Sequence, residues 1–211
     1  MNARQQEYRL SLELLQVNDA VSCIFHSLLA HRSVANFQYK GDSNYSLGSL
    51  GIREVECENI DLTYVKINSD ELSNQLDKEI RPFLNELDST VRESIPRSHT
   101  PLSSPTLTET AVPLLGAQIS LEFFQRRPPV SWERWVLLLD ICRSAALQLS
   151  EQTPVSAKMP TRTVLSNVFD SNLPDCQPYL FKVCRVPIRP EATPQSGLTG
   201  MRRYIRDLMI N

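Results

Sequence analysis

The sequence has little of what most catalytic and metal-binding sites need. Its 211 residues include six glycines and three histidines, and they contain no GxSxG, P-loop, GxGxxG or HExxH motif. His26 and His31 are five residues apart in a predicted helix, which puts them on different faces instead of at the i, i+4 spacing of metal ligands. These absences exclude the common phosphate-binding, hydrolase and zinc motifs.

The sequence also lacks an excess of charge and a long apolar run. The net charge is −2, with 22% charged and 41% hydrophobic residues, which is typical of a globular protein and gives no basic face for nucleic acid or an anionic membrane. Asp140 and Arg143 interrupt the most apolar stretch, so no transmembrane segment is predicted. The first ten residues have no apolar signal-peptide core. We therefore predict a soluble protein of the cytosol or nucleus.

The five cysteines form no CxxC pair. Scattered thiols in a reducing compartment are normally reduced and structural, which is the prediction here. A cysteine-dependent redox sensor or enzyme is the alternative from another functional class, with Cys176 beside Asp175 as its candidate thiol. No paired histidine accompanies that thiol to activate it.

Hydrophobic periodicity predicts the elements of the first half. Residues 8–16 alternate apolar and polar side chains like a half-buried strand, and helical spacing follows over 19–32, with Asn18 or Asp19 as the N-cap. A hairpin region and a strand at 60–67 come next. Ser69 is expected to cap a second helix, which Pro82 should kink or stop. His26 is predicted to lie at a helix surface or boundary.

The second half begins with a Pro/Ser/Thr-rich insertion at about 88–116, in which Thr100 and Ser104 precede prolines and are candidate phosphorylation sites. Strands are predicted at 117–125, 132–142 and 178–186, with one or two helical turns between the last two and helical spacing over 201–209. Strands this close together favour an antiparallel or mixed sheet with helices on one face, an α+β fold.

Two groups of carboxylates have structural interpretations. Glu54, Glu56 and Glu58 alternate along the chain, which predicts a solvated strand face instead of a metal site. Asp170 and Asp175 do not match a calcium loop, and an Asx-turn is the expected role. No metal or cofactor is predicted.

Ten short motifs, taken in order, resemble a known family. They are LLAHRS, FQYK, YSLGSLG, IDLTYVKI, SLEFFQ, WERW, KMPT, NVFD, QPYLFK and MRRYIRD, and they extend from residue 28 to residue 207. In this order they resemble the autophagy-related protein 101 family of HORMA-domain proteins. The resemblance implies a single HORMA domain over 1–211, with a central, mainly antiparallel sheet backed by helices.

The resemblance also implies a function without catalysis or a cofactor. It indicates an adaptor of the autophagy-initiation kinase complex that binds and stabilises the HORMA domain of autophagy-related protein 13, is cytoplasmic, and is recruited to pre-autophagosomal sites. The alternative is a divergent HORMA protein that acts mainly as a homodimer or with another partner. The family's long helix between WERW and KMPT is replaced here by about fourteen residues, and this difference is the basis of the self-association hypothesis.

The resemblance assigns roles to individual residues. The family's Trp-Pro-Phe finger is reduced to a remnant at Pro128, Pro129 and Val130, with no tryptophan at the tip, which puts finger-mediated recruitment in doubt. Side chains expected to pack within the motifs are Trp132, Trp135, Met159, Pro160, Phe169, Pro178 and Tyr179. Hydrogen bonds from Asn167, Asp170 and Gln177 are expected to hold the loop at 166–183.

Overall fold

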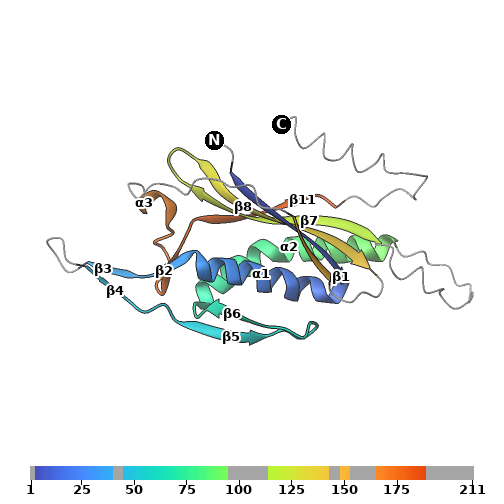
Figure 1. Cartoon of the computed structure of the whole chain (residues 1–211), viewed down its shortest axis with the longest axis horizontal. Coiled ribbons are helices and arrows are strands. Elements are labelled where there is room, and N and C mark those ends of the chain that lie inside the picture. The colour runs from blue at the N-terminus through green and yellow to red at the C-terminus, as the bar shows by residue number, and fades with distance from the viewer. Residues whose placement is uncertain (1–2, 40–44, 95–113, 143–147, 153–164, 189–211) are drawn as a thin grey trace, which may run out of the picture.

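A five-stranded sheet forms the centre of the molecule in the computed structural model, which describes residues 3–39, 45–94, 114–142, 148–152 and 165–188 (Figure 1). The strand order is β11-β7-β8-β1-β9, and only the β1–β8 pair is parallel. The strands are β1 (Arg4–Glu13), β7 (Leu115–Gln125), β8 (Val130–Cys142), β9 (Gln148–Gln152) and β11 (Phe181–Val186). The predicted α+β class, with a mainly antiparallel central sheet, is confirmed.

Two long helices, α1 (Val17–His31) and α2 (Asp70–Ser94), cover one face of this sheet (Figure 1). A short 3-10 turn, η1 (Leu14–Gln16), joins β1 to α1. The apolar stripes of the helices meet alternate residues of the strands, so Phe25, Phe83, Leu121 and Leu137 are all fully buried together. The alternation and the helical spacing read in the sequence therefore mark the two sides of one core.

Three two-stranded ribbons complete the described chain. β2 (Ser33–Ala35) pairs with β10 (Cys176–Pro178), β3 (Phe37–Tyr39) with β4 (Tyr45–Leu47), and β5 (Ile52–Glu56) with β6 (Thr63–Ile67). A single helical turn, α3 (Leu165–Val168), precedes β10. The β5–β6 ribbon lies on the side of α1 that faces away from the main sheet (Figure 1).

Helix α2 begins as predicted but is longer than expected. The Ser69 hydroxyl oxygen accepts a hydrogen bond from the Leu72 backbone N–H at 3.3 Å, which confirms the cap. The helix does not stop at Pro82 but continues to Ser94. Pro82 is on the exposed face, while Phe83 and Leu87 beside it are fully buried, so core packing outweighs the lost backbone bond.

Two other predicted boundaries are wrong. Residues 88–94 of the expected insertion are the end of α2, and its last two residues, 115 and 116, already belong to β7. The cap of α1 is Gln16 instead of Asn18 or Asp19. The Asp19 carboxylate instead accepts hydrogen bonds from Asn59, at the turn of the β5–β6 ribbon. Residues 95–113, with Thr100 and Ser104, lie outside the described residues, as does the predicted tail helix at 201–209.

The segment expected to form helical turns after β8 contains strand β9 instead. β9 pairs antiparallel with β1, and Leu149 is opposite Leu10 in the register. Without β9 that edge of β1 would be unpaired, so sheet completion overrides the weak helical preference of this stretch. No helix among the described residues is long and apolar enough to cross a membrane.

Candidate functional site

Most of the residues singled out in the sequence meet at one end of the sheet, where the β7–β8 turn approaches residues 165–180 (Figure 1). The turn itself, residues 126–129, is exposed. The Gln125 side-chain amide closes it by donating a hydrogen bond to the Pro128 carbonyl at 3.1 Å. Pro128 and Pro129 of the predicted finger remnant therefore sit at the tip, and Val130 is already the first residue of β8.

Backbone hydrogen bonds attach the segment 165–180 to β7. The Arg126 N–H donates to the Asn167 carbonyl at 2.9 Å, and the Phe124 N–H donates to the Leu180 carbonyl at 3.0 Å. Within the segment, the Leu180 N–H donates to the Val168 carbonyl at 2.7 Å. The segment thus doubles back on itself and continues the pairing beyond the end of β11.

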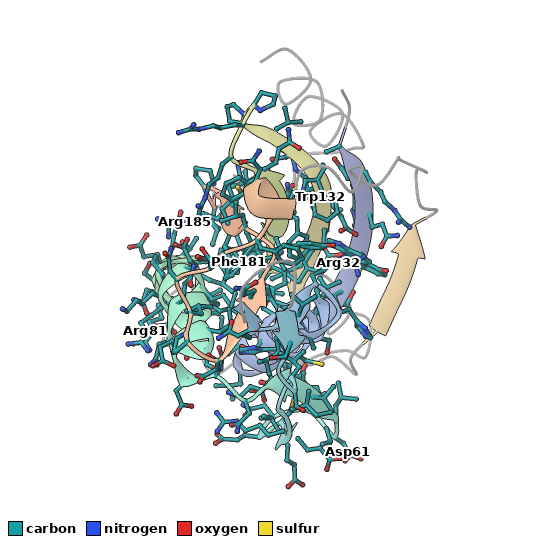
Figure 2. All side chains as sticks on the ribbon, turned by 90° about the vertical axis from the view of Figure 1, so that its left-hand side faces the viewer. Arg32, Asp61, Arg81, Trp132, Phe181 and Arg185 are labelled. Atoms are coloured by element: carbon teal, nitrogen blue, oxygen red, sulfur yellow. The ribbon has the colours of Figure 1, made fainter. Side chains whose placement is uncertain are left out.

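Four aromatic side chains fill the space beneath this segment: Phe123, Trp132, Phe169 and Tyr179, here named the aromatic cluster. The Trp132 and Tyr179 ring centroids are 5.1 Å apart in an edge-to-face arrangement, and those of Phe169 and Tyr179 are 4.7 Å apart. Trp132 is only 8% exposed and belongs to the core (Figure 2). The cluster couples β7, β8 and the returning segment by packing.

Trp135 is placed differently from Trp132. It is partly buried on β8 and stacks on Tyr8 of β1, with ring centroids 5.9 Å apart and planes within 2°. Both tryptophans lie against the core or its boundary, where the sequence located them. That both tryptophans are structural and neither recruits a partner stays a prediction.

A buried ion pair, which sequence reasoning missed, joins α1 to this end of the sheet. The Arg32 guanidinium donates to both carboxylate oxygens of Glu133, at 2.9 and 3.0 Å, and Glu133 is 1% exposed (Figure 2). The hydrogen bond to Glu133 raises the pKa of Arg32 above its ordinary value. The Arg32 carbonyl also accepts a hydrogen bond from the Tyr179 N–H at 2.8 Å. Arg32 and Glu133 belong to LLAHRS and WERW, but no pattern in either motif signals their pairing.

The polar residues that were predicted to hold the loop contribute to it in different ways. The Asp170 carboxylate accepts a hydrogen bond from the Asn172 N–H at 3.1 Å, which confirms the predicted Asx-turn there. Asn167 contributes its backbone carbonyl, and Gln177 lies in β10 opposite Val34. Pro178 is buried, as expected of a packing residue. The Asn36 amide donates to the Pro174 carbonyl and holds the loop from its other side.

Glu122 is a second buried carboxylate that is satisfied within the sheet. It accepts a hydrogen bond from the Ser131 hydroxyl at 2.9 Å and pairs with Arg134 and Lys182 at 2.7 and 3.3 Å. Burial alone would raise the pKa of Glu122, but the Ser131 hydrogen bond and the two cations outweigh it and lower that pKa. The side chain of Glu122 on β7 therefore links β7 to both neighbouring strands, β8 and β11.

His26 corrects a prediction, because it is buried and does not lie at the helix surface. Its ring, 4% exposed, stacks on Tyr64 of the β5–β6 ribbon with centroids 5.9 Å apart. Burial, with the nearby charges of Lys66 and Arg53, lowers the pKa of His26 to about 4. The imidazole is therefore neutral at pH 7 and acts as a packing surface for the ribbon.

The thiols do not show the features of a reactive cysteine. Cys176 is fully buried, and burial raises its pKa, as do the neighbouring carboxylates of Asp175 and Asp170. The cysteines of the described segments are all free.

The carboxylates of the β5–β6 ribbon do not gather into a metal site. Glu54 and Glu56 are exposed on β5, and within the described ranges no group of three or more His, Cys, Asp or Glu side chains could hold a metal. Met159 and Pro160 lie outside those ranges.

Comparison with known proteins gives consistent matches over nearly the whole chain. A family profile described as autophagy-related protein 101 matches residues 9–173. The proteins named autophagy-related protein 101 from Rattus norvegicus and Mus musculus are each 30% identical to this chain, and that from Homo sapiens is 29% identical. Each of these alignments covers 99% of both chains.

Proposed function

Because the chain belongs to the autophagy-related protein 101 family, we propose that it is a non-enzymatic adaptor of the autophagy-initiation kinase complex. Family membership gives it an autophagy-related role and implies the HORMA fold. In the proposed role it binds and stabilises the HORMA domain of autophagy-related protein 13 in the cytoplasm and supports autophagosome formation at pre-autophagosomal sites. The observation that carries the proposal is the family match along 99% of the chain.

The residues at the candidate site favour a binding role over catalysis. The aromatic cluster and the Arg32–Glu133 pair are engaged in packing and hydrogen bonding. Burial raises the pKa of the Cys176 thiol, which favours its less reactive, protonated form. These contacts fix the shape of the surface at this end of the sheet. Protein–protein interfaces depend on such shape complementarity, which an adaptor needs for binding its partner.

We further propose that recruitment through the β7–β8 turn is reduced in this protein. The exposed residues of the turn are Arg126, Arg127, Pro128 and Pro129, and none of them is aromatic. Aromatic side chains are the usual anchors of protein interfaces, so a tip without one offers less binding energy. Trp132, the nearest tryptophan along the chain, is held inside the aromatic cluster.

Light scattering coupled to size exclusion tests the adaptor proposal. The whole chain would be run alone and mixed with the HORMA domain of autophagy-related protein 13. A monomer that shifts to a 1:1 complex is the expected result. A stable homodimer that does not respond to the partner would contradict the proposal and favour the alternative of a divergent, self-pairing HORMA protein.

A further inference from the structure

The β5–β6 ribbon has an open strand edge. The Cys57 N–H donates to the Leu62 carbonyl at 3.0 Å, and the Asn68 N–H donates to the Gly51 carbonyl at 2.9 Å. In an antiparallel pair, hydrogen-bonded and non-hydrogen-bonded positions alternate. The odd-numbered residues of β5 therefore direct their backbone groups toward β6, and the even-numbered ones direct theirs outward. Within the described part of the chain, no strand pairs with that outer edge.

One face of the ribbon, made by the side chains of the even-numbered residues of β5 and by Val65 of β6, is mixed apolar and acidic. Ile52 is 63% exposed, and Val65, which is opposite Glu54 in the register, is 40% exposed. Glu54 and Glu56 are exposed on the same face, because alternate residues of a strand point to the same side. The face thus presents two large apolar side chains beside a row of carboxylates.

The ribbon is held firmly against α1 by its opposite face. Tyr64 stacks on the buried His26, and the Asp19 carboxylate accepts hydrogen bonds from the backbone and side-chain N–H groups of Asn59 at 2.7 and 3.1 Å. Figure 2 shows Asp61, in the turn of the ribbon, projecting away from the body of the molecule. An edge fixed in this way is ready to accept a strand without a large ordering cost.

We propose that the outer edge of β5 binds an extended segment of a partner protein in which Lys or Arg alternates with apolar residues. Backbone groups of Ile52, Glu54 and Glu56 would pair with the added strand, as in other cases of strand addition to a sheet edge. Basic side chains at alternate positions would lie opposite Glu54 and Glu56 on the same face, and the apolar residues between them would lie on the other face, the one that carries Val55. This site is separate from the aromatic cluster and goes beyond the proposed adaptor role.

Charge selects a basic partner over a second copy of this chain. Two copies of β5 paired antiparallel about Glu54 would place Glu54 directly against Glu54, with the other carboxylates close by. Like charges directly opposite in a sheet are destabilising, whereas opposite charges stabilise the pair. A partner strand with Lys or Arg at these positions turns the repulsion into attraction.

The test uses the full chain and a fluorescent, end-capped peptide of sequence Lys-Val-Lys-Val-Lys-Val-Lys. Fluorescence anisotropy measures binding, and backbone NMR identifies the amides that shift. We expect shifts at Ile52, Glu54 and Glu56, and at least tenfold weaker binding of a control peptide with the same composition arranged as four Lys followed by three Val. Equal binding of the two peptides would overturn the proposal, because it would show attraction by charge alone.

Two variants separate backbone pairing from charge. Glu54→Pro removes an outward N–H that is not used in the β5–β6 ladder, so it should weaken binding at least tenfold and leave the melting temperature nearly unchanged. The double variant Glu54→Lys, Glu56→Lys should weaken it at least tenfold. Its matched control, Glu79→Lys with Glu93→Lys, makes the same charge change at exposed positions of α2 and should bind within about twofold of the parent chain.

The other possible results of these experiments also support or contradict strand addition at the β5 edge. Unchanged binding in Glu54→Pro, with the ribbon folded, would overturn strand addition. If that variant unfolds the ribbon, the double lysine variant and its control still test the site, and equal losses in both would overturn it. A dimer of the parent chain in light scattering that Glu54→Pro dissociates would assign the edge to a second copy and contradict a basic partner.

Discussion

The segment 165–180 and the β5–β6 ribbon are both additions to the same helix–sheet core, but they are attached in different ways. The segment buries Cys176, Leu180 and much of Tyr179 and continues the backbone pairing of β7. The ribbon packs one face on α1 and leaves Ile52 and Val65 exposed on the other. Changes in the first region should therefore act mainly on stability, and changes on the outer face of the second mainly on binding.

The largest effect should come from breaking the aromatic cluster. Trp132→Ala is expected to lower the free energy of unfolding by about 3–5 kcal/mol, because it removes a large buried side chain and leaves a cavity. Trp132→Phe should cost less, since the ring contact with Tyr179 is kept and the indole N–H has no hydrogen-bond partner among the described residues. Urea unfolding followed by circular dichroism measures both. Unchanged stability together with lost partner binding would show that Trp132 is a contact residue instead.

A pH-dependent effect should come next, at the contact between the ribbon and α1. The pKa of His26 is about 4 in the folded protein and near its ordinary value of 6.5 in the unfolded chain, so the unfolded chain binds more protons between these values. Stability should therefore fall as the pH drops from 6.5 to 4, by about 3 kcal/mol in total. His26→Phe keeps a ring against Tyr64 and should lose this part of the pH dependence. Equal slopes for the two proteins in urea unfolding would show that the pKa of His26 is the same in the folded and unfolded protein, and would contradict this prediction.

A smaller effect is expected at the turn of the ribbon. Asp19→Ala removes the acceptor of both Asn59 hydrogen bonds and should lower the free energy of unfolding by about 1 kcal/mol. Because the turn would then be held less firmly, amide exchange should become faster for residues 57–62 while the five-stranded sheet is unchanged. Hydrogen exchange measured residue by residue tests this, and faster exchange throughout the sheet would mean that the ribbon and the core unfold together.

The smallest effect is expected from an exposed ion pair of the β5–β6 ribbon. Arg53 and Asp70 form an ion pair at 3.4 Å, but their side chains are 45% and 83% exposed. An exposed pair of this kind contributes little, so Arg53→Ala should change the free energy of unfolding by less than about 0.5 kcal/mol. Thermal unfolding at low and high salt measures it. A loss above 1 kcal/mol would show that the ribbon depends on this pair and not on its stacking against α1.

Local periodicity was sufficient to predict the main strands and helices. The alternation over 117–125 marks β7, the stretch 132–142 is predicted as its neighbouring strand and forms β8, and the apolar stripe after Ser69 marks α2. In β7 the core residues Ile119, Leu121 and Phe123 recur with the period of a strand, so the sequence carries the signal of the core face directly. Ser120 and Glu122 between them are buried as well. The alternating Glu54 and Glu56 likewise indicate the exposed face of β5, where the structure places them.

The errors arise where distant contacts decide the structure. β9 forms because β1 offers it an edge, which nothing within residues 148–152 indicates. His26 has the helical position of a boundary residue, and only the ribbon folded over it makes it buried. The pairing of Arg32 with Glu133, 101 residues away, follows from the parallel placement of β1 beside β8, which no local pattern reveals.

The place of β1 in the sheet has a consequence for how the protein is made. β1 leaves the ribosome before the other described strands, and its neighbours β8 and β9 begin only at Val130 and Gln148. At typical rates of synthesis, β1 is available for roughly ten seconds or more before either partner strand exists. During that time the apolar side chains of Leu10 and Leu12 have no sheet to join, so the nascent chain is a natural client for chaperones, and truncation before β8 should leave an aggregation-prone fragment.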